Sequence, residues 1–379
     1  MPSLGLIATP EPTEHQQDQL ARLDEQHRRM AFLLRPPARW SGTLRRLARV
    51  ESETASTSIE GFTVPLPQAL ELMAGRRGDT ARLEEQRALL CYHQAMDRVL
   101  SLAEEPGFGW NEQLILDLHF MTCYFQPDRL PGRYRRRGIA VTAPGGGVAY
   151  QGPPSDEVPA LMADLVTWLR DGRREEPVVV RAAMAHLHLV SIHPFADGNG
   201  RMARVLQSLV LAREGVLHPE LASIEGYLAG RTAAYYEALQ SAHGPAYDPG
   251  GDASAWLDFC IEAHLAEARR LHDRIELIHR RSTFCERLAG RHGYPDRFAS
   301  ALDQALMGLP VTNAEHRSEH GVAAITASGD LRRMVADGWL APDGAGRSAR
   351  YLASTALNEA WQREERGRGA AAGSGRRPL

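Results

Sequence analysis

Apolar residues recur at helical spacing along most of this chain, whereas few segments alternate with the period of two that strands show. The pattern therefore predicts a mainly α-helical protein. The predicted helices are residues 83–102, 111–124, 155–169, 178–192, 200–214 and 253–274. Residues 138–150 differ, because two short apolar pieces surround a glycine-rich turn and predict a small β-hairpin.

Breaks in this pattern divide the chain into four predicted regions. Residues 1–106 are a helical N-terminal region, and residues 107–274 are a compact helical core. Residues 285–355 form a further unit, which contains two helices followed by two short strands. Residues 362–379 are rich in Gly, Ala and Arg without apolar anchors, so we expect a disordered tail.

The helix ends of the third unit carry their own signals. Thr312 and Thr326 are predicted N-caps, because a hydroxyl there can accept from a free backbone N–H. Gly321 is expected to turn the chain after the first helix, and Gly338 to end the second.

Charge and composition limit the classes of function. The net charge is −3, from 44 basic and 47 acidic residues, which argues against a general nucleic-acid or membrane-surface binder. The chain has no lysine, so contacts to phosphate must come from arginine and backbone N–H groups. The 4 cysteines form no Cys-x-x-Cys pair, and the first residues lack the pattern of a signal peptide. We therefore expect a cytoplasmic protein without membrane contact.

The apolar segment 178–192 predicts a helix that is buried on most sides and leads directly into a loop of specialised residues. Pro194 ends this helix, because the residue before a proline is disfavoured in the helical region. Residues 197–200 are Asp-Gly-Asn-Gly, which tolerate left-handed backbone and close approach by a ligand. Their N–H groups can converge at the start of the next helix, which predicts an anion site.

Charged side chains complete this predicted phosphate site. Arg201 and Arg204 are three apart, so they lie on one face of the following helix and can reach the same anion. Asp197 offers an oxygen ligand to Mg²⁺, which binds proteins through one or two carboxylates plus substrate phosphates. His193, with an ordinary pKa of about 6.5, suits a general base at neutral pH.

Two other interpretations of the loop exist. The residues could form only a turn between two core helices. Alternatively, His186, His188 and His193 could bind a metal ion, although His186 and His188 are two apart and do not share a helix face. Nine consecutive specialised residues followed by two arginines favour the phosphate site over both.

Residues 193–204, His-Pro-Phe-Ala-Asp-Gly-Asn-Gly-Arg-Met-Ala-Arg, resemble the motif of the Fic (filamentation induced by cyclic AMP) family at every defined position. The surrounding residues 51–259 are similar to the family pattern as well. The resemblance implies a helical Fic core with a hairpin flap. It also implies transfer of AMP from ATP to a Ser, Thr or Tyr hydroxyl of a target protein or of the enzyme itself, with Mg²⁺ as cofactor.

The resemblance also implies a role for each loop residue. His193 would take the proton of the target hydroxyl as this attacks the α-phosphate, and Asp197 would hold Mg²⁺. Phe195 would fix the loop to the core as an apolar plug. The residues implied to contact the nucleotide are Gly198, Asn199 and Gly200 in the anion hole, Arg201 and Arg204 at the β- and γ-phosphates, and Tyr236 near the adenine. For Tyr236, packing in the core is the alternative.

Residues 51–61 are interpreted as an inhibitory segment. Gly61 predicts a helix end, which places Glu60 in the last turn, at the unfavourable negative end of the helix dipole. By itself this pattern is typical of a surface glutamate. Ser56 to Gly61, however, resemble the Ser/Thr-x-x-x-Glu-Gly motif of autoinhibited Fic proteins. The resemblance implies that Glu60 pairs with Arg204 and blocks the seat of the γ-phosphate.

Three segments outside the loop could contact partners. The hairpin 138–150 resembles the family's flap, on which a protein target docks by strand addition, with a plain surface hairpin as the alternative. The arginine run at 133–137 is interpreted as a solvated patch, although it could bind an anion.

Residues 311–353 resemble a winged helix in which basic and acidic charges cancel. Three roles therefore stay open for it: contact with DNA through Arg332, Arg333 and Arg347, contact with another protein, or formation of a homodimer.

Other functions are compatible with the same residues. The fold could transfer a different phosphate-linked group, or remove AMP with Glu60 orienting a water. A DNA-binding regulator whose core only senses nucleotide is the alternative from another class. A pure sensor does not need a general base, so His193 favours the enzyme.

Overall fold

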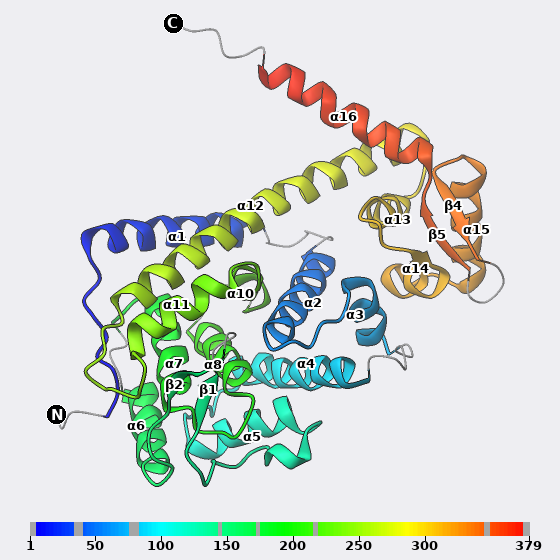
Figure 1. The fold of residues 1–379 in the computed structure, drawn as a ribbon. Helices are drawn as coiled ribbons and strands as arrows, with labels where there is room; N and C mark the ends of the chain where they lie inside the picture. Colours follow the sequence, from blue (N-terminus) through cyan, green and yellow to red (C-terminus); the bar gives the residue numbers. More distant parts are fainter. Residues whose placement is uncertain are drawn as a thin grey trace, which may run out of the picture. The chain divides into compact units, whose positions relative to one another are not determined.

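The computed structural model describes residues 5–33, 41–75, 83–142, 146–171, 175–214, 219–344 and 349–373. These residues are mainly helical, with one two-stranded and one three-stranded sheet (Figure 1). The predicted fold class, mainly α with a small hairpin, is confirmed. None of the helices described combines the length and the apolar character that a membrane span requires.

The chain divides into two compact units. The first comprises Met1–Arg35 and Gly42–His272, and the second Pro36–Ser41 and Asp273–Leu379. Helix α12 (Ser254–Arg291) belongs to both, so the helix predicted at 253–274 continues to Arg291.

The first unit contains eleven further helices and one hairpin among its described residues. Before the hairpin lie α1 (Glu14–Leu33), α2 (Ser41–Ile59), α3 (Leu66–Met73), α4 (Leu83–Ala103), α5 (Glu112–Cys123) and the 3₁₀ turn η2 (Pro127–Arg129). After it lie α6 (Val158–Asp171), α7 (Val178–Ile192), α8 (Asn199–Arg213), α9 (Pro219–Ala222), α10 (Glu225–Gly230) and α11 (Thr232–His243).

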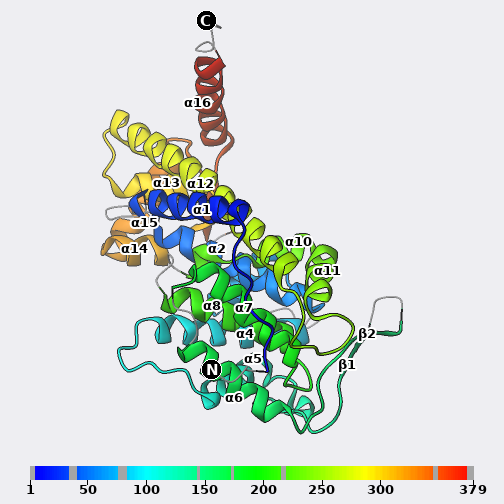
Figure 2. The ribbon, with the colours of Figure 1, turned by 90° about the vertical axis from the view of Figure 1, so that its left-hand side faces the viewer.

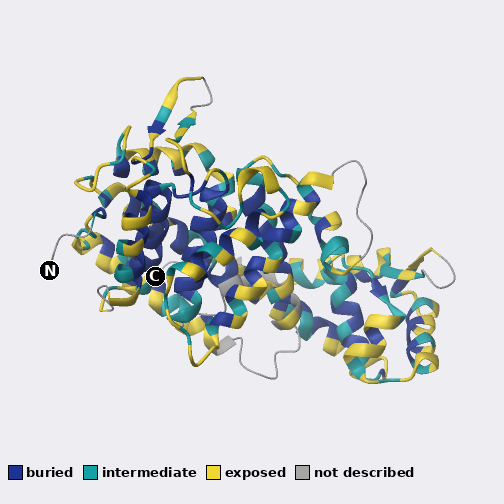
Figure 3. Cartoon of the chain, turned by 90° about the horizontal axis from the view of Figure 1, so that it is seen from below, coloured by how far each residue is buried: buried dark blue, intermediate teal, exposed yellow. Residues whose placement is uncertain are grey.

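Helices α7 and α8 form the centre of this unit. Every residue of α7 after Val178 is buried, which confirms the buried helix predicted at 178–192. Helix α8 packs against α4, α5 and α7, and Figure 3 shows the buried residues gathered in the interior. Trp256 of α12 donates its indole N–H to the Ala183 carbonyl oxygen at 2.8 Å, and so fixes α12 on α7. The loop between α7 and α8 is therefore held by the best-packed part of the unit.

One buried side chain of α7 costs stability. His188 is 1% exposed and packs edge-on against Trp168 at 4.8 Å between ring centroids. Neither of its ring nitrogens has a hydrogen-bond partner among the residues that the structure describes. Burial lowers the pKa of His188 from 6.5 to about 3, so the ring is neutral when folded.

We expect His188→Phe to raise the free energy of unfolding by about 1–3 kcal/mol at pH 7, because no buried polar atom is then left unpaired. The gain should grow by roughly 2 kcal/mol at pH 5. There the unfolded histidine binds a proton that the folded one does not, so the parent loses stability as the pH falls from about 6.5 toward 3. Urea unfolding of parent and variant at both pH values measures this. A variant less stable than the parent at pH 5 would contradict it.

The predicted hairpin is present. Strands β1 (Ala140–Thr142) and β2 (Val148–Gln151) pair antiparallel, with a register shift between Val141 and Thr142. Figure 2 shows them extending away from the helices. The Tyr150 hydroxyl donates to the Ser191 carbonyl oxygen, which ties β2 to the end of α7. Residues 143–145 of the predicted turn lie outside the described residues.

The second unit is built on helices α13 (Arg297–Leu306), α14 (Asn313–His320) and α15 (Ala324–Ala336). Its strands are β3 (Val311–Thr312), β4 (Leu340–Asp343) and β5 (Arg350–Ala353), antiparallel in the order β3-β5-β4. The two helices and two strands predicted here are thus present. The winged-helix role remains a prediction, and Arg347 lies outside the described residues.

Three of the four predicted helix-end residues have the predicted role. Thr312 accepts from the Glu315 N–H at 3.2 Å, and Gly321 and Gly338 are left-handed with φ of 61° and 81°. The N-cap predicted at Thr326 is wrong, because α15 begins at Ala324 with Ala323 as its cap. Once Gly321 has reversed the chain, only two residues separate it from the next helix, so Thr326 lies within the first turn.

The disordered tail predicted at 362–379 is wrong as far as Gly373, since helix α16 spans Thr355–Gly373. Trp361 packs against Phe284 at 5.5 Å between ring centroids. Arg287 and Arg280 of α12 bind Glu364 and Glu365, at 2.6 and 3.3 Å. The segment is also rich in Ala, Glu and Arg, which favour helix formation. The prediction of disorder relied on composition and did not take these contacts with α12 into account. Residues 374–379 lie outside the described part.

Candidate active site

The loop between α7 and α8 is closed by its own hydrogen bonds. His193 caps α7 in the left-handed conformation, with φ of 50°. The Asn199 side chain accepts from the Phe195 N–H and donates to the Phe195 carbonyl oxygen, both at 2.9 Å. Phe195 is fully buried and stacks on His119 at 3.6 Å between ring centroids. Phe195 therefore lies where a plug between loop and core would.

His119 of α5 contacts the loop through Phe195 and Asp197, and it was not predicted from the sequence. Its Nδ1 accepts from the Gly132 N–H at 2.9 Å, so Nε2 carries the proton and donates to the Asp197 carbonyl oxygen at 2.9 Å. Burial lowers the pKa of His119 to about 4, which keeps this tautomer neutral. In the sequence it is one histidine on a helix 78 residues from Asp197, so no local signal marks it.

Gly198 and Gly200 are required for the close packing around the loop. Gly198 has φ of 77°, and a Cβ there would lie 2.3 Å from the Cys123 Sγ. A Cβ on Gly200 would lie 2.5 Å from Glu60 Oε1 and 3.3 Å from Arg204 Nη1. At the start of α8, Cys123 and Glu60 thus lie so close to the backbone that no side chain would fit at either glycine.

Arg201 and Arg204 bring two buried guanidinium groups to the start of α8. The Arg201 guanidinium lies beside the rings of Phe62 and Phe125, at 5.2 and 5.3 Å from their centroids. Its Nε and Nη1, and Nη1 of Arg204, are buried without a hydrogen-bond partner among the described residues. Buried charged donors without partners are costly, and an anion such as a phosphate would satisfy them. Both guanidinium groups lie close enough to Glu60 for their charges to lower its pKa.

Ser56 and Glu60 of the predicted inhibitory segment meet Arg204. Helix α2 ends at Ile59, and Gly61 follows with φ of 87°. Arg204 donates from Nε to the Ser56 hydroxyl at 2.7 Å, and from Nη2 to the Ser56 carbonyl oxygen at 3.1 Å and to Glu60 Oε1 at 2.9 Å. Burial raises the pKa of Glu60, but the charges of Arg204 and Arg201 outweigh this, so its pKa is lowered and Glu60 is ionised at neutral pH.

Asp197 has a half-buried carboxylate at the mouth of the loop. Its Oδ1 accepts from the Gly198 N–H at 2.6 Å and lies 3.6 Å from Arg201 Nη2. Its Oδ2 lies 3.7 Å from Nε of the exposed Arg129. One carboxylate that retains solvent access beside unpaired guanidinium donors fits Mg²⁺ bound jointly with substrate phosphates.

His193 has one ring nitrogen free for chemistry. Its Nδ1 lies 3.1 Å from the Val190 carbonyl oxygen, which can only accept, so Nδ1 carries the proton and Nε2 keeps a lone pair. Burial lowers the pKa of His193 from 6.5 to about 4, partly offset by the bond to Val190 and helped by the charge of Arg135. At neutral pH the ring is therefore uncharged, and Nε2 can act as a base.

Arg135 holds the base in place, and it is the second residue that sequence reasoning missed. It is 5% exposed, which corrects the interpretation of the whole run 133–137 as a solvated patch. Its Nε donates to the His193 carbonyl oxygen at 2.8 Å, its Nη2 to Pro153 at 2.7 Å, and its N–H to Pro194 at 2.9 Å. No sequence signal separates Arg135 from the exposed arginines beside it.

The remaining predicted residues fall at the edge of the site or outside it. Tyr236 is 46% exposed, and its pKa is raised first by burial and then by the charge of Glu60, with Arg204 opposing. It thus lies in the electrostatic range of both, but no contact assigns it to adenine. The two ring nitrogens of His186 are hydrogen-bonded to Gln207 at 2.8 Å and to Tyr235 at 3.0 Å. Both nitrogens are therefore used in contacts within the core.

Comparisons with known proteins agree with this geometry. Residues 109–211 match the model of the Fic/DOC family. The chain is 32% identical over 151 residues to a probable protein adenylyltransferase of Aquifex aeolicus, covering 38% of this chain and 45% of that one. It is 31% identical over 163 residues to the protein adenylyltransferase Fic of Aedes aegypti, covering 42% and 31%. The chain thus spans less than half the length of these curated relatives.

A solved structure extends the similarity beyond the matched domain. A Fic family protein from Desulfovibrio desulfuricans G20 superposes with a TM-score of 0.59 at 26% identity. The superposition covers 92% of this chain and 98% of that one. The chain therefore shares the fold of that Fic family protein, and the residues that match the family model include the loop from His193 to Arg204.

Proposed function

We propose that this chain is a protein adenylyltransferase, which transfers AMP from ATP to a Ser, Thr or Tyr hydroxyl of a target protein or of itself. One observation carries the proposal. An unprotonated His193 Nε2 stands on the same short loop as a pair of buried guanidinium groups with unpaired donors. Relatives named as adenylyltransferases support the same reaction.

The loop supplies the parts that such a transfer requires. His193 Nε2 takes the proton of the target hydroxyl while its oxygen bonds to the α-phosphorus, and the bond from that phosphorus to pyrophosphate breaks. Arg201 and Arg204 would hold the β- and γ-phosphates with their free donors, and the N–H groups at the start of α8 would line the anion hole. Mg²⁺, held by Asp197, would neutralise charge on the phosphates. Phosphoryl transfer depends mainly on such positioning and charge.

The hairpin β1–β2 would position the target. It stands beside His193, since Gln151 lies at its base and the Tyr150 hydroxyl reaches Ser191. Val148, at its outer part, is 64% exposed. A target segment added as a third strand would present its hydroxyl near the base.

Glu60 would restrain this activity. Arg204 donates from Nη2 to Glu60 and from Nε to Ser56. These two N–H donors are therefore not available to a γ-phosphate. The Glu60 carboxylate also covers the start of α8, where a Cβ on Gly200 would meet it at 2.5 Å. In this proposal the described arrangement is the inhibited one.

Labelled nucleotides test the reaction directly. The protein is incubated with Mg²⁺ and with ATP labelled at either the α- or the γ-phosphate, and label on protein is measured. Label from α-labelled but not from γ-labelled ATP, lost in EDTA, is expected. Label from γ-labelled ATP would indicate phosphorylation instead, and label from neither, in the native protein or in Glu60→Gly, would contradict the proposal. Mass spectrometry of modified peptides then identifies the hydroxyl.

Arg135 offers a separate test of how the base is positioned. Arg135→Met should lower transfer by on the order of 10²-fold, because small displacements of a catalytic group cost that much, while ATP affinity stays unchanged. Arg136→Met, at the exposed neighbouring position, is the matched control and should behave like the parent. Turnover and nucleotide binding are measured separately. Equal activity of the two variants would contradict the positioning role.

A further inference from the structure

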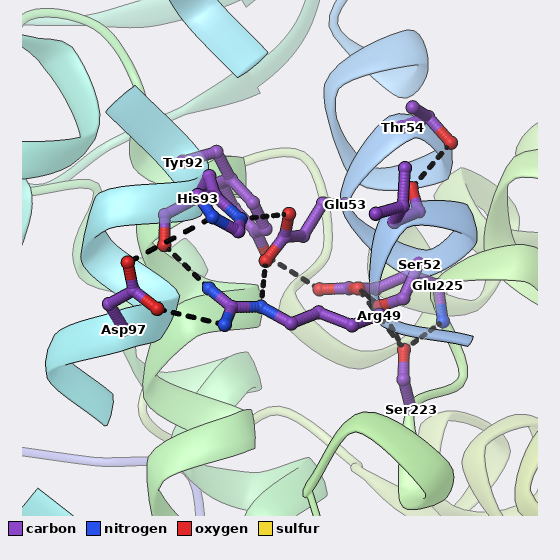
Figure 4. Close-up of polar contacts among 10 residues, drawn as sticks. Arg49, Ser52, Glu53, Thr54, Tyr92, His93, Asp97, Ser223 and Glu225 are labelled. Atoms are coloured by element: carbon purple, nitrogen blue, oxygen red, sulfur yellow. Dashed lines mark hydrogen bonds and ion pairs between the residues drawn. The ribbon is translucent and has the colours of Figure 1, made fainter. Parts of the chain in front are cut away.

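Helix α2, which carries Ser56 and ends one residue before Glu60, is held on the rest of the first unit by polar side chains, of which Tyr92 and Glu225 are buried (Figure 4). We call Ser52, Tyr92, Ser223 and Glu225 the anchor cluster. They come from α2, from α4, from the segment before α10 and from α10 itself. Neither the proposed reaction nor the proposed restraint by Glu60 uses them.

Glu225 is the centre of the anchor cluster. It is 3% exposed, and its Oε1 accepts from the Tyr92 hydroxyl at 2.5 Å. Its Oε2 accepts from the Ser223 hydroxyl at 3.1 Å and from the Ser52 hydroxyl, and the two serine oxygens lie 2.7 Å apart. One carboxylate thus joins α2 to α4 and α10. Burial raises the pKa of Glu225, so holding a carboxyl group there costs stability that simple packing would not.

The spacing along α2 connects this cluster to the active site. Ser52 and Ser56 are four apart and share one face of α2, and Glu60 follows four residues later, directly after the helix ends at Ile59. A slip of α2 by one residue would rotate that face by about 100°. Both contacts to Arg204 would then be lost together. The bond between Ser52 and Glu225 therefore fixes the register in which Ser56 and Glu60 reach Arg204.

A second set of polar contacts, centred on Glu53, also holds α2 on α4. Glu53 is 1% exposed and accepts from Arg49 Nε and from His93 Nδ1, each at 2.7 Å. Arg49 also binds Asp97 of α4 at 2.8 Å. These contacts join α2 to α4 only, whereas Glu225, which is similarly buried, also joins α2 to α10.

We propose that Glu225 is a positioning residue of the inhibitory segment: through Ser52 and Tyr92 it sets the register of α2 that delivers Ser56 and Glu60 to Arg204. The inference rests on the proposed function, because it names what maintains the restraint on that site. A change in α10 would then alter the restraint, although it changes neither the loop, the nucleotide nor Glu60.

The test uses Glu225→Gln and Ser52→Ala in the full chain, each in the native and in the Glu60→Gly background. With α-labelled ATP, each should raise self-modification of the native protein by on the order of tenfold, which is a typical coupling between sites. Neither should add to Glu60→Gly, where no restraint is left. Tyr227→Phe, which removes the 2.9 Å bond from another residue of α10 to Glu262, is the matched control and should leave transfer unchanged.

Amide hydrogen exchange separates failure of this inference from failure of the proposed function. Peptides within 44–59 should exchange faster in Glu225→Gln and Ser52→Ala than in the parent and in Tyr227→Phe, whatever the activity. Unchanged exchange in that segment would overturn the inference, as would an equal rise in transfer in the Glu60→Gly background. If no variant is labelled, including Glu60→Gly, the proposed function fails, and exchange alone then decides whether Glu225 positions α2.

Discussion

Replacement of His193 with alanine is expected to lower AMP transfer by about 10²–10⁴-fold, the usual contribution of a general base. The affinity for ATP should remain near that of the parent, because the phosphate donors belong to Arg201, Arg204 and the start of α8. The structure gives the physical reason. The Val190 carbonyl fixes the proton on Nδ1, which leaves Nε2 as the only basic atom on the loop that is neutral at pH 7.

Two measurements make this result informative. Label from α-labelled ATP gives transfer, and equilibrium binding of a non-hydrolysable analogue gives affinity. His15→Ala, at an exposed position on α1, is the control for loss of a histidine as such. Transfer retained by His193→Ala would exclude it as the base. Joint loss of transfer and binding would instead show that the side chain supports the loop.

The second large effect is expected from Glu60→Gly, in the opposite direction. Transfer should rise by roughly 5–150-fold, the range of an ordinary coupling free energy between two sites. The variant removes the Glu60 contact from Nη2 of Arg204, which keeps its bond to the Ser56 carbonyl oxygen, and it uncovers the backbone at Gly200. It also leaves Arg204 less well paired, so the variant without nucleotide should melt at a lower temperature, and ATP should raise its melting temperature more than that of the parent.

Glu60→Gln distinguishes charge from bulk. It keeps the size of the side chain but removes the ion pair with Arg204, so an intermediate rise is expected if both matter. If Glu60→Gly labels a target no faster than the parent labels it, the proposed restraint is contradicted. A lower melting temperature without any change in transfer would reduce Glu60 to a structural partner of Arg204.

Several features could be predicted from sequence because each depends on neighbours in the chain. The helical periodicity of 178–192 gave the bounds of α7, since a helix buried on nearly all sides leaves an apolar run with a sharp end at Pro194. Gly321 and Gly338 marked helix ends, because a left-handed residue is a local requirement. Prediction failed for helix α16, because this helix is stabilised by contacts with Phe284 and with two arginines of α12 that are distant in the sequence.

By itself, then, the sequence determined the mainly helical class, the hairpin and a loop that gathers a base, a carboxylate and two arginines within twelve residues. Only the tertiary structure decided what those groups can do. Arg204 meets Glu60 across 144 residues, and the buried Arg135 differs from the exposed arginines beside it only in what surrounds it. The reason is physical: periodicity and turn chemistry are encoded locally, whereas burial, tautomer and the pairing of charges are set by segments that meet only when the chain is folded.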